Sequence, residues 1–154
     1  MFGALILGNI CEADTLHGRV VGVSDGDTVT VLDENNKQNK IRLSGIDAPE
    51  KAQAYGQKSK ESLSELVFGK SVDVEWNKQD RYGRTVGKIM LDGVDICLEQ
   101  VKRGMAWHYK QYQNEQAPHD RVAYAESENL ARSNRTGLWQ DSSPVEPSAF
   151  RHKK

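Results

Sequence analysis

The sequence predicts one α+β domain, a five-stranded Greek-key β-barrel of the OB-fold type with three helices. Three segments with strand-like alternation follow one another, and a helix then separates them from two more strands and two more helices. Strands and helices do not alternate one by one, so a doubly wound parallel sheet is not expected. The 154 residues are enough to bury a single core.

Each element is predicted by its local pattern. In the second strand Val29 and Val31 alternate with threonines, and the segment DENNKQN that follows has the composition of a hairpin turn. The first helix places Leu63, Leu66 and Val67 on one face. The expected strands are 17–24, 27–33, 40–46, 71–76 and 83–91, and the expected long helices are 55–70 and 120–134. Between them, 94–104 is expected to be a strand end followed by a short helix that stops at Gly104.

The two ends of the chain differ from the domain between them, 14–140. Residues 1–13 form a short apolar run that ends in a small residue, which favours a signal peptide over an N-terminal apolar strand. A secreted or periplasmic protein without stable membrane association after leader removal is therefore expected. Residues 141–154 contain prolines and a basic end, which is typical of a flexible C-terminal tail.

Composition restricts the partners. The formal net charge is −1, so no overall basic field would attract a polyanion, and such a partner would have to be held by a local site. The two cysteines, Cys11 and Cys97, lie near no other residues with ligand spacing. Cys97 stands in an apolar segment and is expected to be a small buried hydrophobe.

Acidic residues stand where two predicted strands begin or end. The segment DGDT, with Asp25 and Asp27, is explained by a solvated turn at least as well as by a cation site. An EF-hand is excluded, because Val29 and Asn36 occupy positions that must supply oxygen ligands. Asp47 follows the third strand, and acids at the ends of adjacent strands can converge on one cation. Such hard oxygen ligands suit Ca²⁺.

Two further segments carry arginines. Arg42 alternates with Ile41 and Leu43 and should point away from the core, where an arginine is usually only solvated. Glu50 either favours the first turn of the next helix or acts chemically. The segment DRYGR, which contains Arg84, is either a tight turn or a second guanidinium for a phosphate. A cation, a carboxylate and forked guanidiniums are the groups that phosphoryl chemistry requires.

The segments DGDTV, IRLSGIDAPE and DRYGR, in this order and spacing, resemble the three signature segments of the staphylococcal nuclease (thermonuclease) family. The resemblance covers about residues 17–139 and implies a calcium-dependent OB-fold nuclease that acts on DNA and RNA. The residues it implies are the calcium ligands Asp27, Asp47 and the Ala48 carbonyl, the catalytic Arg42, Glu50 and Arg84, the metal-flanking Asp25, and Tyr82 near the bound phosphate.

Two positions depart from the family pattern. Ala48 stands where a threonine is often found, which removes a hydroxyl near the metal but keeps the carbonyl. The segment after Gly104 does not align clearly with the tyrosines that stack on the base, so Tyr109 and Tyr112 are both candidates for substrate binding.

The resemblance implies a monomeric endonuclease that favours single strands and cuts on the 5′-oxygen side of the phosphate, leaving 3′-phosphates. The alternative is a non-catalytic OB module that binds single-stranded nucleic acid. Such a module would be expected to lose the acids and arginines that this chain keeps. A purely structural calcium-binding domain would leave Arg42 and Arg84 without a role.

Overall fold

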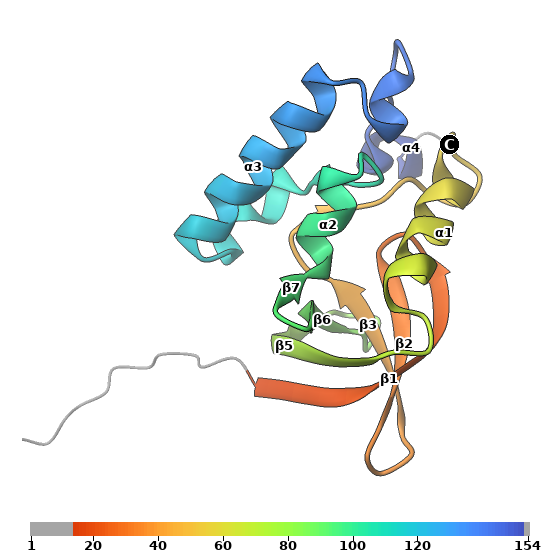
Figure 1. Cartoon of the computed structure of the whole chain (residues 1–154), viewed down its shortest axis with the longest axis vertical. Coiled ribbons are helices and arrows are strands. Elements are labelled where there is room, and N and C mark those ends of the chain that lie inside the picture. Colours follow the sequence, from red (N-terminus) through yellow and green to blue (C-terminus); the bar gives the residue numbers. More distant parts are fainter. Residues whose placement is uncertain (1–13, 153–154) are drawn as a thin grey trace, which may run out of the picture.

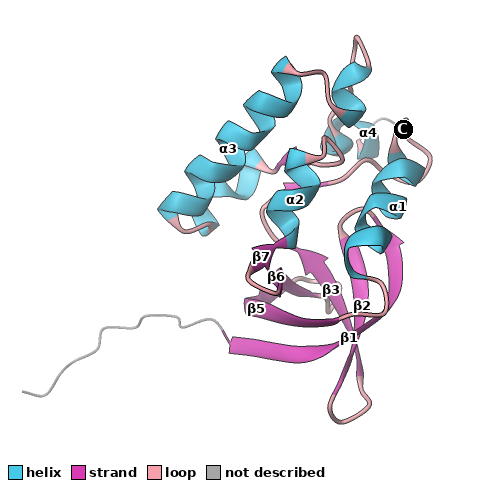
Figure 2. Cartoon of the chain, in the orientation of Figure 1, coloured by secondary structure: helices cyan, strands magenta, loops and turns pink. Residues whose placement is uncertain are grey.

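The computed structural model describes residues 14–152, which form a β-barrel with helices gathered at one end (Figures 1 and 2). The predicted signal peptide, 1–13, lies outside the described residues. The strands are β1 (Asp14–Asp25), β2 (Thr28–Asp33), β3 (Gln38–Leu43), β4 (Ile46–Asp47), β5 (Ser71–Gln79), β6 (Thr85–Leu91), β7 (Val94–Asp95) and β8 (Trp107–His108). The helices are α1 (Gly56–Val67), α2 (Ile96–Lys102), α3 (Pro118–Ser133) and α4 (Pro147–Arg151), with two 3₁₀ segments, Lys110–Glu115 and Gly137–Gln140.

The main sheet has the order β3-β2-β1-β5-β6-β7, and a parallel pairing of β3 with β6 closes it into a barrel. β1 is long and irregular, and it pairs with β5 through its first half and with β2 through its second. The closed five-stranded barrel with its helices confirms the predicted OB-fold class. β1 begins three residues before the predicted strand.

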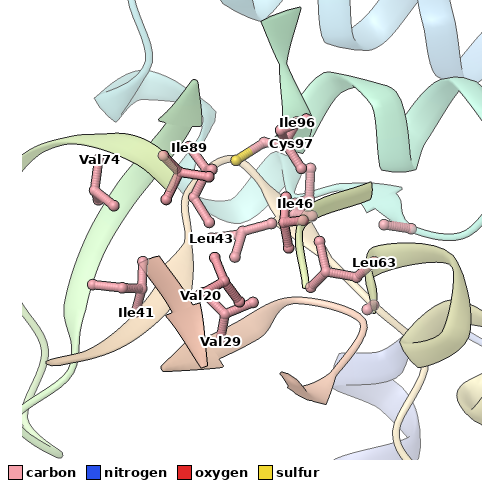
Figure 3. Close-up of a cluster of buried hydrophobic side chains, with 14 of the residues drawn as sticks. Val20, Val29, Ile41, Leu43, Ile46, Leu63, Val74, Ile89, Ile96 and Cys97 are labelled. Carbon is pink, nitrogen blue, oxygen red and sulfur yellow. The ribbon is translucent and has the colours of Figure 1, made fainter. Parts of the chain in front are cut away.

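The core lies inside the barrel and beneath the helices (Figure 3). Ile41 and Leu43 of β3 are fully buried, which confirms the alternation read from the sequence and turns Arg42 toward the outer face. Leu63 of α1 and Ile96 of α2 close the end of the barrel that the helices cover. Cys97 is buried in the same cluster, as expected for a small hydrophobe.

The segment that was expected to be a flexible tail contains a helix. Residues 141–152 turn back toward α1, and the side-chain amide of Gln53 donates a hydrogen bond to the Val145 carbonyl. α4 follows, with Pro147 in its first turn, where the missing N–H of proline costs nothing. In the part of the chain that the structure describes, no helix is long and apolar enough to cross a membrane.

Candidate active site

The DGDT segment is a tight turn that also places an acid in a buried position. β1 and β2 are joined at Asp25 and Thr28, which leaves only Gly26 and Asp27 between them. The Asp25 carboxylate accepts the Asp27 N–H at 3.1 Å, while the Asp27 side chain is turned inward and is almost fully buried. The tight turn itself therefore positions the buried carboxylate of Asp27.

Gly26 is required because two elements pack directly against it. A Cβ at this position would lie 1.8 Å from the Ser59 Oγ of α1 and 2.8 Å from the Ala48 Cβ. Ala48 in turn donates its backbone N–H to the Asp27 Oδ2 at 2.8 Å, and Thr28 donates its hydroxyl to Oδ1 at 3.1 Å. Close packing at Gly26 thus holds the Asp27 turn against the segment that carries Asp47 and Ala48.

Asp47 is fixed by a short ladder between β4 and β8. It pairs with Trp107, and its carboxylate is 3% exposed. Arg42 spans the turn that leads to it, donating through Nη1 to the carbonyls of Leu43 at 2.7 Å and Ile46 at 2.9 Å. Position 45 adopts a left-handed φ of 80°, which glycine tolerates.

Arg42 joins the two acids. Its Nη2 lies 3.3 Å from the Asp27 Oδ2 and 3.2 Å from the Asp47 Oδ1, so the two carboxylates converge on a single atom. The sequence expectation that Arg42 points away from the core is confirmed, but its side chain is only 13% exposed and is paired rather than solvated.

The charges in this cluster alter one another's pKa values. Burial opposes ionisation of Asp27, but the Arg42 guanidinium and the hydrogen bonds it accepts hold the pKa of Asp27 below its ordinary value. Burial raises the pKa of Asp47, although Arg151 and Arg42 oppose the shift. Burial and the neighbouring charge of Asp27 raise the pKa of Asp25 to about 7. Two acids here thus share a positive partner, while Asp25 gains a proton easily.

Glu50 reaches the cluster through an arginine that the sequence analysis missed. Arg151 of α4 donates to Glu50 Oε1 at 2.7 Å and to both carboxylate oxygens of Asp47, at 3.1 and 3.0 Å. The same guanidinium donates to the Tyr109 hydroxyl at 3.3 Å. Arg151 lies in the expected flexible tail, where no periodicity or motif signals a contact with the site.

The two tyrosine candidates have different positions. The Arg42 guanidinium lies 5.9 Å from the centre of the Tyr109 ring, so Tyr109 borders the acid cluster. Tyr112 packs edge-on against Tyr109, with ring centres 4.8 Å apart, and the Lys78 ammonium lies 5.4 Å from the centre of the Tyr112 ring. Lys78 is itself paired with Glu115, so the two rings form an aromatic surface next to the cluster without a free positive charge from Lys78.

Arg84 and Tyr82 form a neighbouring group rather than part of the acid cluster. Asp80 accepts the backbone N–H groups of both residues and holds the Arg84 Nε at 2.7 Å. Arg84 directly precedes β6, and in the β3–β6 pairing Arg42 lies opposite Val86. Since side chains two residues apart in a strand share a face, Arg84 lies on the same outer face as Arg42. The Tyr82 ring is 68% exposed and lies under the Arg84 guanidinium.

The side chains at this site supply only part of a possible cation site. Within residues 14–152 no group of three His, Cys, Asp or Glu side chains is arranged to hold a metal ion. Asp27 and Asp47 nevertheless converge on one positive group, so their two carboxylates are the side-chain ligands available, with the Ala48 backbone N–H against Asp27 beside them. Carboxylate oxygens suit a hard cation.

The structure thus defines a small closed OB-barrel domain with paired acids and two arginines at one edge, and guanidinium groups of this kind can bind a phosphate bidentately. A family profile described as staphylococcal nuclease homologue matches residues 40–141. The chain belongs to this staphylococcal nuclease family.

Relatives of similar length support the assignment. An uncharacterized endonuclease of Haemophilus influenzae is 46% identical over 144 residues, which cover 94% of this chain and 78% of the relative. An uncharacterized endonuclease of Escherichia coli O157:H7 is 43% identical, over 90% of this chain and 87% of the relative. A micrococcal nuclease of Shigella flexneri is 38% identical, over 87% and 79%. The class of enzyme that follows is a hydrolytic nuclease.

Proposed function

We propose that the protein is a calcium-dependent endonuclease that hydrolyses phosphodiester bonds of DNA and RNA. The observation that carries the proposal is the convergence of two buried carboxylates, Asp27 and Asp47, on one Arg42 nitrogen. Glu50 lies next to them and is linked to Asp47 through Arg151. A site built only to stabilise the fold has no need for such a concentration of charge at the barrel edge. The family and the names of its members support nucleic acid as the substrate.

Calcium, when bound by Asp27, Asp47 and the Ala48 carbonyl, would supply positive charge to a non-bridging phosphate oxygen. Glu50 would accept a hydrogen bond, and then the proton, from the water that attacks phosphorus. Arg42 and Arg84, on the same outer face, would donate to the phosphate oxygens as negative charge increases. The P–O5′ bond would break, O5′ would take up a proton from water, and the products would end in a 3′-phosphate and a 5′-hydroxyl.

Of the two tyrosines, Tyr109 would stack on the base beside the cut phosphate, a role supported by its ring near the Arg42 guanidinium and by its hydroxyl, which accepts from Arg151. Tyr112 and Tyr82 would contact neighbouring nucleotides. Stacking of this kind is tolerant of sequence and suits single strands. Export through residues 1–13 and a monomeric state remain parts of the proposal that rest on the sequence.

The test is digestion of heat-denatured DNA with calcium and with a chelator. Glu50→Gln and Arg84→Ala should each lower the rate by about 10²–10³-fold with folding intact. Glu61→Gln, an exposed acid of α1, and Arg19→Ala, an exposed arginine of β1, are the matched controls and should stay within twofold of wild type. Binding of single strands without calcium-dependent cleavage by wild type would instead support the non-catalytic OB module.

A further inference from the structure

The C-terminal segment of the described chain passes over one side of the active site. We name residues 145–152 the strap. The strap is held at its start by the hydrogen bond from Gln53 to Val145 and by the buried ring of Pro147. Between it and the body of the protein lies a cavity of about 80 Å³, lined on one side by Asp47 and Tyr109 and on the other by 146–148. The strap therefore touches the residues that the proposed function places around the metal.

Arg151, at the end of the strap, forms ion pairs with the acids themselves. Its two terminal nitrogens contact both oxygens of Asp47, and one of them also donates to Glu50 at 2.7 Å. A forked guanidinium on a carboxylate is among the stronger ion pairs in proteins. One side chain thus engages an acid assigned to the metal and the acid assigned to the attacking water.

These contacts compete with the working site. A calcium ion must approach the Asp47 oxygens to about 2.3–2.6 Å, where it would meet the positive charge of Arg151 on the same oxygens. Arg151 also occupies Oε1 of Glu50, one of the two carboxylate oxygens that could accept a proton from the attacking water. Arg42 contacts only one oxygen of Asp47, whereas Arg151 contacts both. Arg42 is also fixed by two backbone carbonyls, whereas Arg151 is held by the short helix α4 and the anchors at the start of the strap.

We propose that the strap is autoinhibitory: Arg151 acts as an internal cation on Asp47 and Glu50, and calcium must displace it before the site can work. The inference rests on the proposed calcium site. Release of the strap breaks few contacts, since α4 has five residues and Pro147 is its one buried residue. Calcium affinity is then set partly by the strap and not by the ligands alone.

The test is calorimetric titration of the full chain with calcium alone. Arg151→Ala should bind calcium about tenfold more tightly than wild type, and Arg151→Lys, which keeps the charge but not the fork, should lie between them. Lys51→Ala removes a positive charge beside Glu50 in sequence; Lys51 is exposed and has no ion pair among the described residues, so this control should bind within twofold of wild type.

Hydrogen exchange of the wild-type protein supplies a second readout. Amides of residues 149–152 should exchange faster when calcium is added, because α4 is released. Equal calcium affinity in wild type and Arg151→Ala, or slower exchange of the strap with calcium, would overturn the autoinhibition and leave the calcium site standing. Absence of calcium binding in every variant would overturn both proposals. Loss of nuclease activity by Arg151→Ala at saturating calcium would instead make Arg151 a substrate-binding residue and would also overturn the autoinhibition.

Discussion

Replacing Gly26 with alanine tests whether close packing at the DGDT turn builds the active site. The added Cβ would lie 1.8 Å from the Ser59 Oγ, 2.7 Å from the Ser59 Cβ and 2.8 Å from the Ala48 Cβ, so the chain must move. Overpacking of this kind costs about 1–3 kcal/mol. The Ser59 hydroxyl also donates to the Met105 carbonyl at 2.6 Å, and loss of that bond adds about 1 kcal/mol.

We therefore expect Gly26→Ala to lower the free energy of unfolding by about 2–4 kcal/mol in urea titrations. Calcium binding should weaken too, since Ala48 is pushed away from Asp27. Gly22→Ala, in the strand that leads to this turn, is the matched control. Its Cβ would meet nothing closer than 3.7 Å, so it should change stability by no more than about 0.5 kcal/mol.

A double-mutant cycle identifies the contact responsible. In Gly26→Ala with Ser59→Gly, two of the three close contacts are removed, so the combined loss should be smaller than the sum of the single losses by about 1 kcal/mol or more. The reasoning is refuted if Gly26→Ala is as stable as the Gly22→Ala control, or if the two changes are simply additive.

Three further predictions concern neighbouring groups. In the presence of a chelator, the free energy of unfolding should fall as pH rises from about 4 to about 7, because the Asp25 pKa is raised on folding and the unfolded chain loses that proton first. Asp25→Asn should make this fall smaller in urea titrations at several pH values, since the raised pKa values of Asp47 and Asp95 still contribute to it. Glu128→Ala should lower the free energy of unfolding by about 2–4 kcal/mol in thermal or urea titrations, because the buried backbone N–H of His108 loses its acceptor. A loss below about 0.5 kcal/mol would contradict this. Asp80→Asn should keep the fold, because only the ion pair with the Arg84 side chain is lost. The factor by which kcat falls should be about ten times the factor by which KM changes. An unchanged kcat would show that Asp80 does not position Arg84.

Regular elements with a clear period were predictable from the sequence. The alternation of Ile41 and Leu43 fixed the inner and outer faces of β3, and the apolar face of α1 was found with boundaries within a few residues. The convergence of Asp27 and Asp47 also followed from their places at strand ends. These features depend on local pattern and on short connections.

Features that depend on contacts between distant segments were not predictable. The ladder between β4 and β8 has two residues on each side, too few to show a period. α4 has five residues, and the contact of Arg151 with Asp47 spans most of the domain. The different positions of Tyr109 and Tyr112 relative to Arg42 likewise depend on contacts in three dimensions.

The parallel pairing of β3 with β6 has a consequence for when the enzyme becomes active. Arg42 and Arg84 share a face only because these two strands meet, and a parallel pair needs the whole intervening chain, α1 and β5 included, to bring it together. If both arginines bind the cut phosphate as proposed, a partly folded chain carries them but cannot present them together. Hydrolysis then requires the closed barrel, and its appearance during refolding would report barrel closure directly.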